Sequence, residues 1–290
     1  MRNVVEAPVM LRSGCWQDGA CQREVRVRAV AEDDEGLVDD LNAAALPLER
    51  NTRLLERCVL GLGREEDVSQ LSLGDRETLL LHARRLTFGS QIDCVLSCPE
   101  CGERMDFQLQ VDRLLAQQDA AAPPLYFEET MQAGGESFRV RFRLPCGADL
   151  EDALREAKRR LVDAVQTVLA RSVAWVRSDG ESADTTTLAA ISMDEWPSEL
   201  AGRISERMAA LDPQAETALQ LTCPACRQSF TTFFDIGDYF FRELRTREQR
   251  RYREVHQLAL AYHWSETEIL SMSPRKRQLY LDLLAENSFD

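Results

Sequence analysis

The chain has 290 residues, of which 44% are hydrophobic and 29% charged, and its formal net charge of −14 gives a pI near 4.8. This composition is enough to fill a core, and no window offers the ~20 consecutive apolar residues that a membrane span needs. The acidic balance argues against nucleic-acid binding as the main task, because contacts with phosphate require a basic surface. No signal-peptide pattern opens the chain, so we expect a cytoplasmic protein.

Two similar units are predicted along the chain, after an N-terminal segment, 1–23, that we expect to be mobile. The first unit spans residues 24–117. It opens with EVRVRAV, in which apolar residues alternate with charged ones, a pattern typical of a half-buried strand. Farther on, residues 75–89 have the pattern of a helix in which Asp75 lies in the first turn and Gly89 ends the helix.

The second unit spans residues 125–241, after a linker at 118–124. It contains a hairpin pattern whose second strand, SFRVRFRL, aligns without a gap with the strand of the first unit and places Val25 on Phe138. In both units the strand is followed by two helical stretches, a Cys-Pro-x-Cys turn and another strand pattern. We infer an internal duplication and expect the two copies to be related by an approximate twofold axis.

A C-terminal segment, 245–290, lies outside this repeat and has the pattern of three helices. Ser265, followed by Glu268, predicts a capping box at the start of the second of these helices. The segment has more apolar and aromatic residues than a free tail needs, so we expect a part centred on Tyr262 and Trp264 to bind another protein. The alternative is that these side chains are all core. The fold class predicted for the whole chain is α+β.

The nine cysteines include two ordered pairs, in the turns SCPEC and TCPAC. Cys98 and Cys101 lie in the first unit, and Cys223 and Cys226 lie in the second, each pair between strand patterns as in a zinc ribbon. One Cys-x-x-Cys turn supplies two of the four thiolates that a tetrahedral zinc ion binds, so two turns complete one site. We therefore expect these four residues to bind one structural Zn²⁺ that the two units share.

Redox chemistry is the alternative function for the Cys-Pro-x-Cys turns. A thiol oxidoreductase needs its first cysteine at a helix N-terminus, which lowers the thiol pKa, whereas the residues after Cys101 and Cys226 alternate like strands. No catalytic residues are predicted, because none of the three histidines has the spacing of a metal site or a catalytic triad. The role of Cys15 and Cys21 stays open.

Three stretches together carry a resemblance to a known family: DRETLLLHARRLTFG (75–89), TCPAC (222–226) and EVHQLALAYHWSETEIL (254–270). Over about residues 24–284 the chain resembles the baseplate proteins and hub assembly chaperones of T-even-type phages, which also occur in prophages and in phage-tail-like contractile injection systems. The residues that match the family pattern are Asp75, Arg76, Gly89, Glu254, His256, Tyr262, Trp264, Ser265 and Glu268. Arg227 departs from it, because a glycine often follows the second knuckle, as Gly102 follows the first.

The resemblance implies a non-enzymatic structural or assembly role in a contractile-tail baseplate or its hub, with other baseplate or hub proteins as partners. The alternative from another class is a zinc-ribbon adaptor in transcription or RNA handling, which the acidic charge disfavours. The oligomeric state stays open, as does whether the protein remains in the assembled tail-like particle or leaves after assembly.

Overall fold

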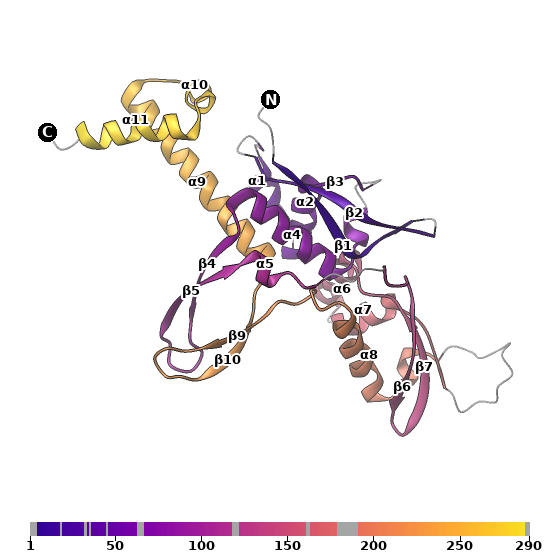
Figure 1. The fold of residues 1–290 in the computed structure, drawn as a ribbon. Helices are drawn as coiled ribbons and strands as arrows, with labels where there is room; N and C mark the ends of the chain where they lie inside the picture. The colour runs from indigo at the N-terminus through magenta and orange to yellow at the C-terminus, as the bar shows by residue number, and fades with distance from the viewer. Residues whose placement is uncertain are drawn as a thin grey trace. The chain divides into compact units, whose positions relative to one another are not determined.

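The computed structural model describes residues 5–17, 19–31, 34, 36–44, 46–62, 67–117, 122–160, 163–178 and 191–287 (Figure 1). Residues 1–4 and 18 of the expected N-terminal segment, and residues 118–121 of the expected linker, lie outside these ranges. The chain divides into two compact units, Met1–Gly237 and Asp238–Asp290, which are called the first and second unit from here on. These are not the two predicted repeats, which lie almost wholly within the first unit and are called its two halves. Helices and strands both build the first unit, so the predicted α+β class is confirmed.

A three-stranded antiparallel sheet opens the first unit. Its order is β1–β2–β3, with β1 at Glu6–Gln17, β2 at Ala20–Arg28 and β3 at Val59–Leu60. β1 and β2 form a hairpin whose pairing shifts between Met10 and Cys15. The half-buried strand expected at the start of the first repeat is β2, and its inward side chains, Val25 and Val27, are buried.

The expectation of a mobile segment over residues 1–23 is wrong for the described part of that segment, because it supplies β1 and the start of β2. Val9 and Leu11 of β1 are 2% and 0% exposed. The alternation of buried and exposed residues is interrupted where the pairing shifts, so the strand has no continuous period-two pattern.

Helices and a second hairpin complete the first half of this unit: α1 Leu37–Asn42, α2 Pro47–Cys58, α3 Asp67–Gln70, α4 Leu73–Phe88, β4 Gln91–Ser97, β5 Arg104–Gln110 and α5 Val111–Leu114. The predicted helix at 75–89 is α4. The hydroxyl of Ser72 caps it by accepting the Asp75 N–H at 3.2 Å, and Gly89 ends it with φ at 93°.

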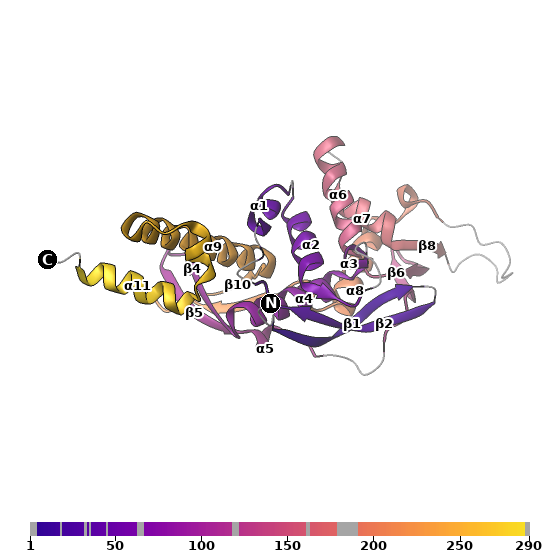
Figure 2. The ribbon, with the colours of Figure 1, turned by 90° about the horizontal axis from the view of Figure 1, so that it is seen from above.

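The side chain of Asp75 fixes the β1–β2 hairpin to α4, which lies along the hairpin in Figure 2. This carboxylate is fully buried and accepts the N–H groups of Arg12, Ser13 and Gly14 at 2.7, 3.1 and 2.8 Å. Those groups lie where the pairing of β1 with β2 shifts. Asp75 therefore supplies acceptors to backbone donors that would otherwise be buried at a cost in free energy.

The second half of this unit follows the same order of elements. Its elements are β6 Phe127–Ala133, β7 Glu136–Phe142, α6 Gly147–Arg160, α7 Ala164–Ser172, β8 Val173–Ser178, the 3-10 turn η1 Met193–Glu195, α8 Ser198–Leu211, β9 Ala218–Thr222 and β10 Ser229–Phe233. The sheet order is again hairpin first and third strand last, β6–β7–β8. A core forms where α8 packs on this sheet: Met131, Phe138, Val140, Phe142, Leu169, Val176, Leu200, Ile204 and Met208. The repeated order supports the predicted duplication.

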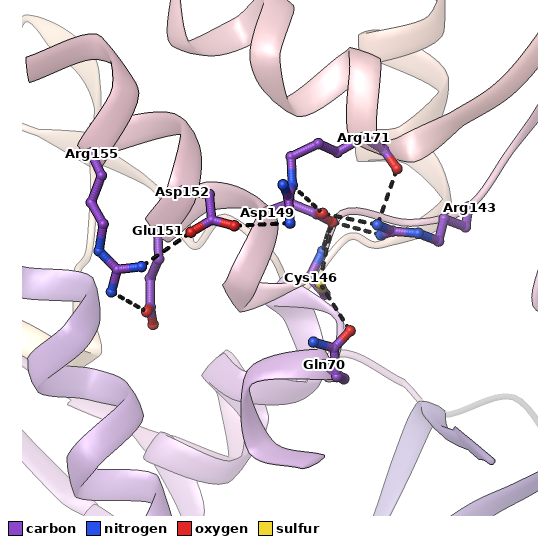
Figure 3. A network of polar contacts seen from close by, with 8 residues as sticks. All are labelled: Gln70, Arg143, Cys146, Asp149, Glu151, Asp152, Arg155 and Arg171. Carbon is purple, nitrogen blue, oxygen red and sulfur yellow. Dashed lines mark hydrogen bonds and ion pairs between the residues drawn. The ribbon is translucent and has the colours of Figure 1, made fainter. Parts of the chain in front are cut away.

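An ion-pair clamp fixes the end of β7 in the second half (Figure 3). Arg143 donates to both carboxylate oxygens of Asp149, at 2.6 and 2.8 Å, and to the Arg171 carbonyl at 3.1 Å. The N–H of Cys146 donates to the same carboxylate at 3.0 Å. One carboxylate thereby holds the strand end, the following turn and the end of α7 together.

The first half contains the same clamp. Arg28 donates to both oxygens of Asp34, each at 2.9 Å, and to the Arg57 carbonyl at 2.7 Å. The N–H of Ala31 donates to the Asp34 carboxylate at 2.7 Å. Four matching hydrogen bonds in matching places are independent support for the duplication.

The two clamps also revise the alignment of the repeats. They place Asp34 on Asp149, an offset of 115 positions, whereas the sequence alignment of Val25 on Phe138 has an offset of 113. A shift of two residues keeps each strand side chain on the same face of the sheet, because side chains alternate with period two. Pattern matching within the strands therefore cannot detect the shift.

The second unit contains most of α9, Ile236–Tyr262, together with α10, Glu266–Ser271, and α11, Pro274–Asn287. The capping box of Ser265 and Glu268 at the start of α10 is confirmed. The ring of Trp264 stacks on Tyr262 with centroids 4.5 Å apart and meets Tyr280 edge-on at 4.9 Å. The two aromatic residues expected to form a docking surface thus pack against each other and against α11.

Among the described helices, none combines the length and the apolar character that crossing a membrane requires.

We predict that Asp149→Asn lowers the free energy of unfolding by about 2–4 kcal/mol at pH 7, because Asp149 is 1% exposed and its loss removes the counter-charge of Arg143. Burial alone would raise the pKa of Asp149, but the hydrogen bonds from Arg143 and Cys146 lower it to about 2. An unfolded aspartate titrates near pH ~4, so the stabilisation is complete above that pH and is lost as the pH falls toward about 2. Urea unfolding of both proteins across this pH range measures the difference.

Asp40→Asn is the matched control, because Asp40 is 57% exposed and its ion pair with Arg57, at 3.2 Å, lies at the surface. We expect it to change the free energy of unfolding by less than about 0.5 kcal/mol. Equal effects of the two substitutions at pH 7 would contradict the clamp, as would an Asp149→Asn effect of undiminished size at pH ~2.5.

Candidate metal centre

Each Cys-Pro-x-Cys turn closes a β-hairpin. β4 pairs with β5 as far as Ser97↔Arg104, and β9 pairs with β10 as far as Thr222↔Ser229. The enclosed loops, CPECGE and CPACRQ, have the same length. The strands expected on both sides of each turn are therefore confirmed, and the two hairpins lie side by side (Figure 1).

Matching backbone hydrogen bonds fix the two loops. In each loop the N–H of the first cysteine donates to a carbonyl five residues on, and the N–H four residues on donates back to the carbonyl of that cysteine. The distances are 2.8 Å (Cys98 to Glu103) and 2.9 Å (Gly102 to Cys98) in the first loop, and 2.9 Å (Cys223 to Gln228) and 2.9 Å (Arg227 to Cys223) in the second.

The residue after the second cysteine has a left-handed backbone in both loops. Its φ is 75° at Gly102 and 61° at Arg227. The departure from the family pattern at Arg227 thus leaves the turn unchanged, although a side chain at positive φ is strained where glycine is not.

The four sulfur atoms form one cluster. The Sγ atoms of Cys98 and Cys226 are 3.8 Å apart, those of Cys101 and Cys223 are 3.7 Å apart, and all four lie within 4.8 Å of one another. Four sulfurs around a tetrahedral zinc ion at ~2.3 Å would be about 3.8 Å apart. The donor set and its spacing therefore fit a four-coordinate metal ion without movement of the loops.

Apolar side chains surround the inner part of the cluster. Cys98 and Cys223 are 2% and 0% exposed, Cys226 is half-buried and Cys101 is exposed. The side chains packed around them come from all four strands: Leu96, Met105, Leu221 and Phe230. The hairpins thus share a small core that contains the sulfurs, and the outer edge of the cluster is open to solvent.

Neighbouring groups act in opposite directions on the pKa values of Cys223 and Cys101. Backbone N–H groups of Cys226 and Ala225 lower the pKa of Cys223 to about 7. At Cys101 the N–H of Glu103 lowers the pKa, but desolvation and the other three sulfurs outweigh it and raise the pKa to about 12. Four thiolates this close repel one another, so a positive ion is needed before all four are charged together.

The other candidates from the sequence do not form a second site. Within the described residues, no other group of three or more His, Cys, Asp or Glu side chains comes together with the geometry of metal ligands. Cys15 is buried, and Cys21 donates to the Ser13 carbonyl at 3.3 Å. Burial and the neighbouring Arg85 lower the pKa of His82 to about 4, which keeps this histidine neutral at pH 7.

The sequence did not predict a group of carboxylates at the start of α4, of which Asp75 and Asp212 are buried and Glu77 is half-buried. Burial raises the pKa of Asp212 to about 6, with nearby Asp75 adding to the rise, and raises the pKa of Glu77 to about 8. Asp212 accepts the Gly74 N–H at 2.8 Å. The two aspartates are 137 positions apart and each looked like an ordinary helix end, so no local signal indicated that they meet.

We predict that Arg227→Gly keeps the sulfur cluster and changes the free energy of unfolding by between zero and about 1 kcal/mol in the stabilising direction. The left-handed strain is relieved, and the greater freedom of glycine in the unfolded chain offsets part of the gain. The reciprocal Gly102→Arg should destabilise by about 1 kcal/mol. Thermal melts of metal-loaded protein measure both changes, and a marked destabilisation by Arg227→Gly would show that its side chain is needed.

The family model described as T4 bacteriophage base plate protein matches residues 48–241, about two-thirds of the chain. The matched region contains both hairpins of the sulfur cluster. Comparisons with curated proteins and with solved structures gave no match. The resemblance inferred from the sequence is thus confirmed at the level of the family: the chain belongs to the T4 bacteriophage base plate protein family.

Proposed function

We propose that this chain is a non-enzymatic structural or assembly protein of a contractile-tail or injection-system baseplate, acting at its hub, and that one structural zinc ion binds its four clustered cysteines. The family match supports a structural role in a phage baseplate and makes other baseplate proteins its partners. The contractile context, the place at the hub and the identity of the metal go beyond that match.

The observation that carries the proposal is the closure of one sulfur cluster by two loops 125 positions apart. Thiolate ligands in a tetrahedral array select zinc or iron, and a zinc ion with four cysteine ligands has no open position for a substrate. Such an ion stabilises a fold and does no chemistry. This is the metal site expected of a component whose task is to hold a shape among partners.

The ion would fix the two hairpins as one body. Each hairpin has only two strands, and an isolated two-stranded hairpin is marginal in water. Bonds from both loops to one ion would hold the strand tips in place, so the exposed faces of the hairpins would be presented rigidly. Rigid presentation lowers the entropic cost of binding a partner.

We predict one zinc ion per chain by elemental analysis of protein purified without chelators. Cys98→Ser or Cys223→Ser should abolish stoichiometric zinc and cost much of a binding free energy of roughly 10–16 kcal/mol, which in such sites is also folding energy. Cys58→Ser is the control, because Cys58 is fully buried outside the cluster and should affect stability more mildly and leave the zinc content unchanged. Absence of metal or two ions per chain would contradict the zinc assignment. So would a coloured protein in which elemental analysis finds iron.

The baseplate role can be tested in a producing strain. We predict that deletion of the gene for this chain prevents assembly of complete tail particles, and that the wild-type chain restores them whereas the Cys223→Ser variant restores far fewer. Particle counts by electron microscopy give the readout. Normal numbers of contractile particles after deletion would refute the role.

A tagged copy of the chain distinguishes a structural component of the particle from an assembly chaperone. Mass spectrometry that finds it in purified particles indicates a structural component, and its presence only in assembly intermediates indicates a chaperone. Neighbours captured by cross-linking in either fraction would identify the part of the baseplate, and capture of proteins remote from the hub would refute the hub placement.

A further inference from the structure

The outer face of α11 carries exposed leucines in a unit with few buried residues. Leu279 and Leu283 are 57% and 47% exposed. The opposite face of the helix is occupied within the unit: Arg277 pairs with Glu254 at 3.1 Å, and Tyr280 packs against Trp264. The two leucines therefore do not belong to the packing that holds α11 in place.

These leucines lie in a seam with a charged residue at each end. Lys276, Leu279, Leu283 and Glu286 follow one another at spacings of three, four and three, which places all four on one side of the helix. Lys276 and Glu286 are exposed. Within the described part of the chain neither forms an ion pair, although the Lys276 ammonium lies 6.0 Å from the centre of the Tyr280 ring.

The charges of the seam match those of a second copy only when the two helices pack antiparallel. If two copies pack antiparallel, with a twofold axis midway between the leucines, Leu279 of each copy lies against Leu283 of the other. The same arrangement places Lys276 of each copy opposite Glu286 of the other. A parallel pair would set Lys276 against Lys276 and Glu286 against Glu286, and like charges directly opposed are destabilising.

The distribution of charge permits this contact. Residues 238–290 contain nine Lys and Arg and nine Asp and Glu, so the whole formal charge of −14 falls in residues 1–237. Two copies that meet through the second unit therefore bring neutral units together.

We propose that the seam Lys276–Leu279–Leu283–Glu286 binds a second copy of this chain, α11 against α11 and antiparallel. The contact is isologous, so each copy contributes the same surface and the pair closes as a dimer. It is small compared with the ~1,600 Å² of a standard interface, so the dimer is weak, with a dissociation constant in the micromolar range.

Sedimentation velocity of the full-length chain between about 1 and 500 μM tests the proposal. We expect a monomer–dimer equilibrium that Lys276→Glu and Glu286→Lys each weaken by roughly tenfold or more, because two attractive pairs become two repulsive ones. The double variant Lys276→Glu/Glu286→Lys restores both pairs with the signs exchanged and should dimerise within about threefold of the wild type.

The charge reversals are suitable because neither should unfold the helix. Lys276→Glu places a negative charge in the first turn of α11, and Glu286→Lys places a positive charge in the last, and both positions favour those signs. Leu279→Asp should abolish dimerisation. Leu260→Asp is its control, because Leu260 is 71% exposed on α9 and lies outside the seam.

A chain that stays monomeric throughout the concentration range overturns the proposal, even if the seam captures a different protein. Dimerisation that survives Leu279→Asp, or that Leu260→Asp disrupts equally, overturns the assignment of the face. A double charge reversal that fails to regain the dimer overturns the antiparallel arrangement. Circular dichroism of each variant verifies that it is folded. If Leu279→Asp is unfolded, the charge variants alone decide the test.

Discussion

The first turn of α4 is the joint on which the two halves of the first unit depend. A buried helix start has N–H groups that the helix itself cannot satisfy. Here the N–H of Gly74 donates to the carboxylate of Asp212, which belongs to the second half. The N–H of Asp75 donates to the Ser72 hydroxyl, and the Asp75 carboxylate accepts N–H groups of β1. The Arg76 guanidinium reaches back to the Val68 carbonyl at 3.1 Å. One helical turn thus forms hydrogen bonds with three separate parts of the chain. Any side chain at Gly74 would collide with Asp212, so this contact also requires glycine at that position.

This joint determines how readily the sulfur cluster closes. Along the chain the two loops are 125 positions apart, but Cys98 follows Gly74 by 24 residues and Cys223 follows Asp212 by 11. Because Gly74 and Asp212 are already bonded, a metal ion bound by both loops would close a ring of about 35 residues and not one of about 125, which would reduce the entropic cost of closure by about 1 kcal/mol. The metal site and the buried joint are therefore coupled energetically, although no residue belongs to both. Loss of the joint should weaken metal binding, and loss of a bound metal should weaken the joint by the same free energy.

The sequence predicted those features that have a local physical signature. Period-two alternation located β2 and β7, the Ser265 and Glu268 pair located the start of α10, and two Cys-Pro-x-Cys turns located the sulfur cluster. The features it missed depend on long-range contacts. β1 was missed because its pairing shifts in the middle of the strand. The alignment of the two predicted repeats was two residues out of register, because an alignment shift of two residues preserves the face of every side chain. The partnership of Asp75 with the N–H groups of β1, and that of Asp212 with Gly74, lie between segments with no pattern in common.

The proposed duplication would also account for the position at which the second unit, Asp238–Asp290, begins. Both second hairpins lead directly into a helix, which starts at Val111 in the first half and at Ile236 in the second, and both of these residues are buried, at 0% and 1% exposed. In the first half the helix ends after one turn, at Leu114, whereas in the second half it continues to Tyr262. Starting a helix is the costly step, and adding residues to one that has already started is cheap. The C-terminal unit thus extends an element that the repeat already begins, which requires no separate nucleus and no linker, and the surfaces of α10 and α11 add to the molecule without altering the halves that carry the sulfur cluster.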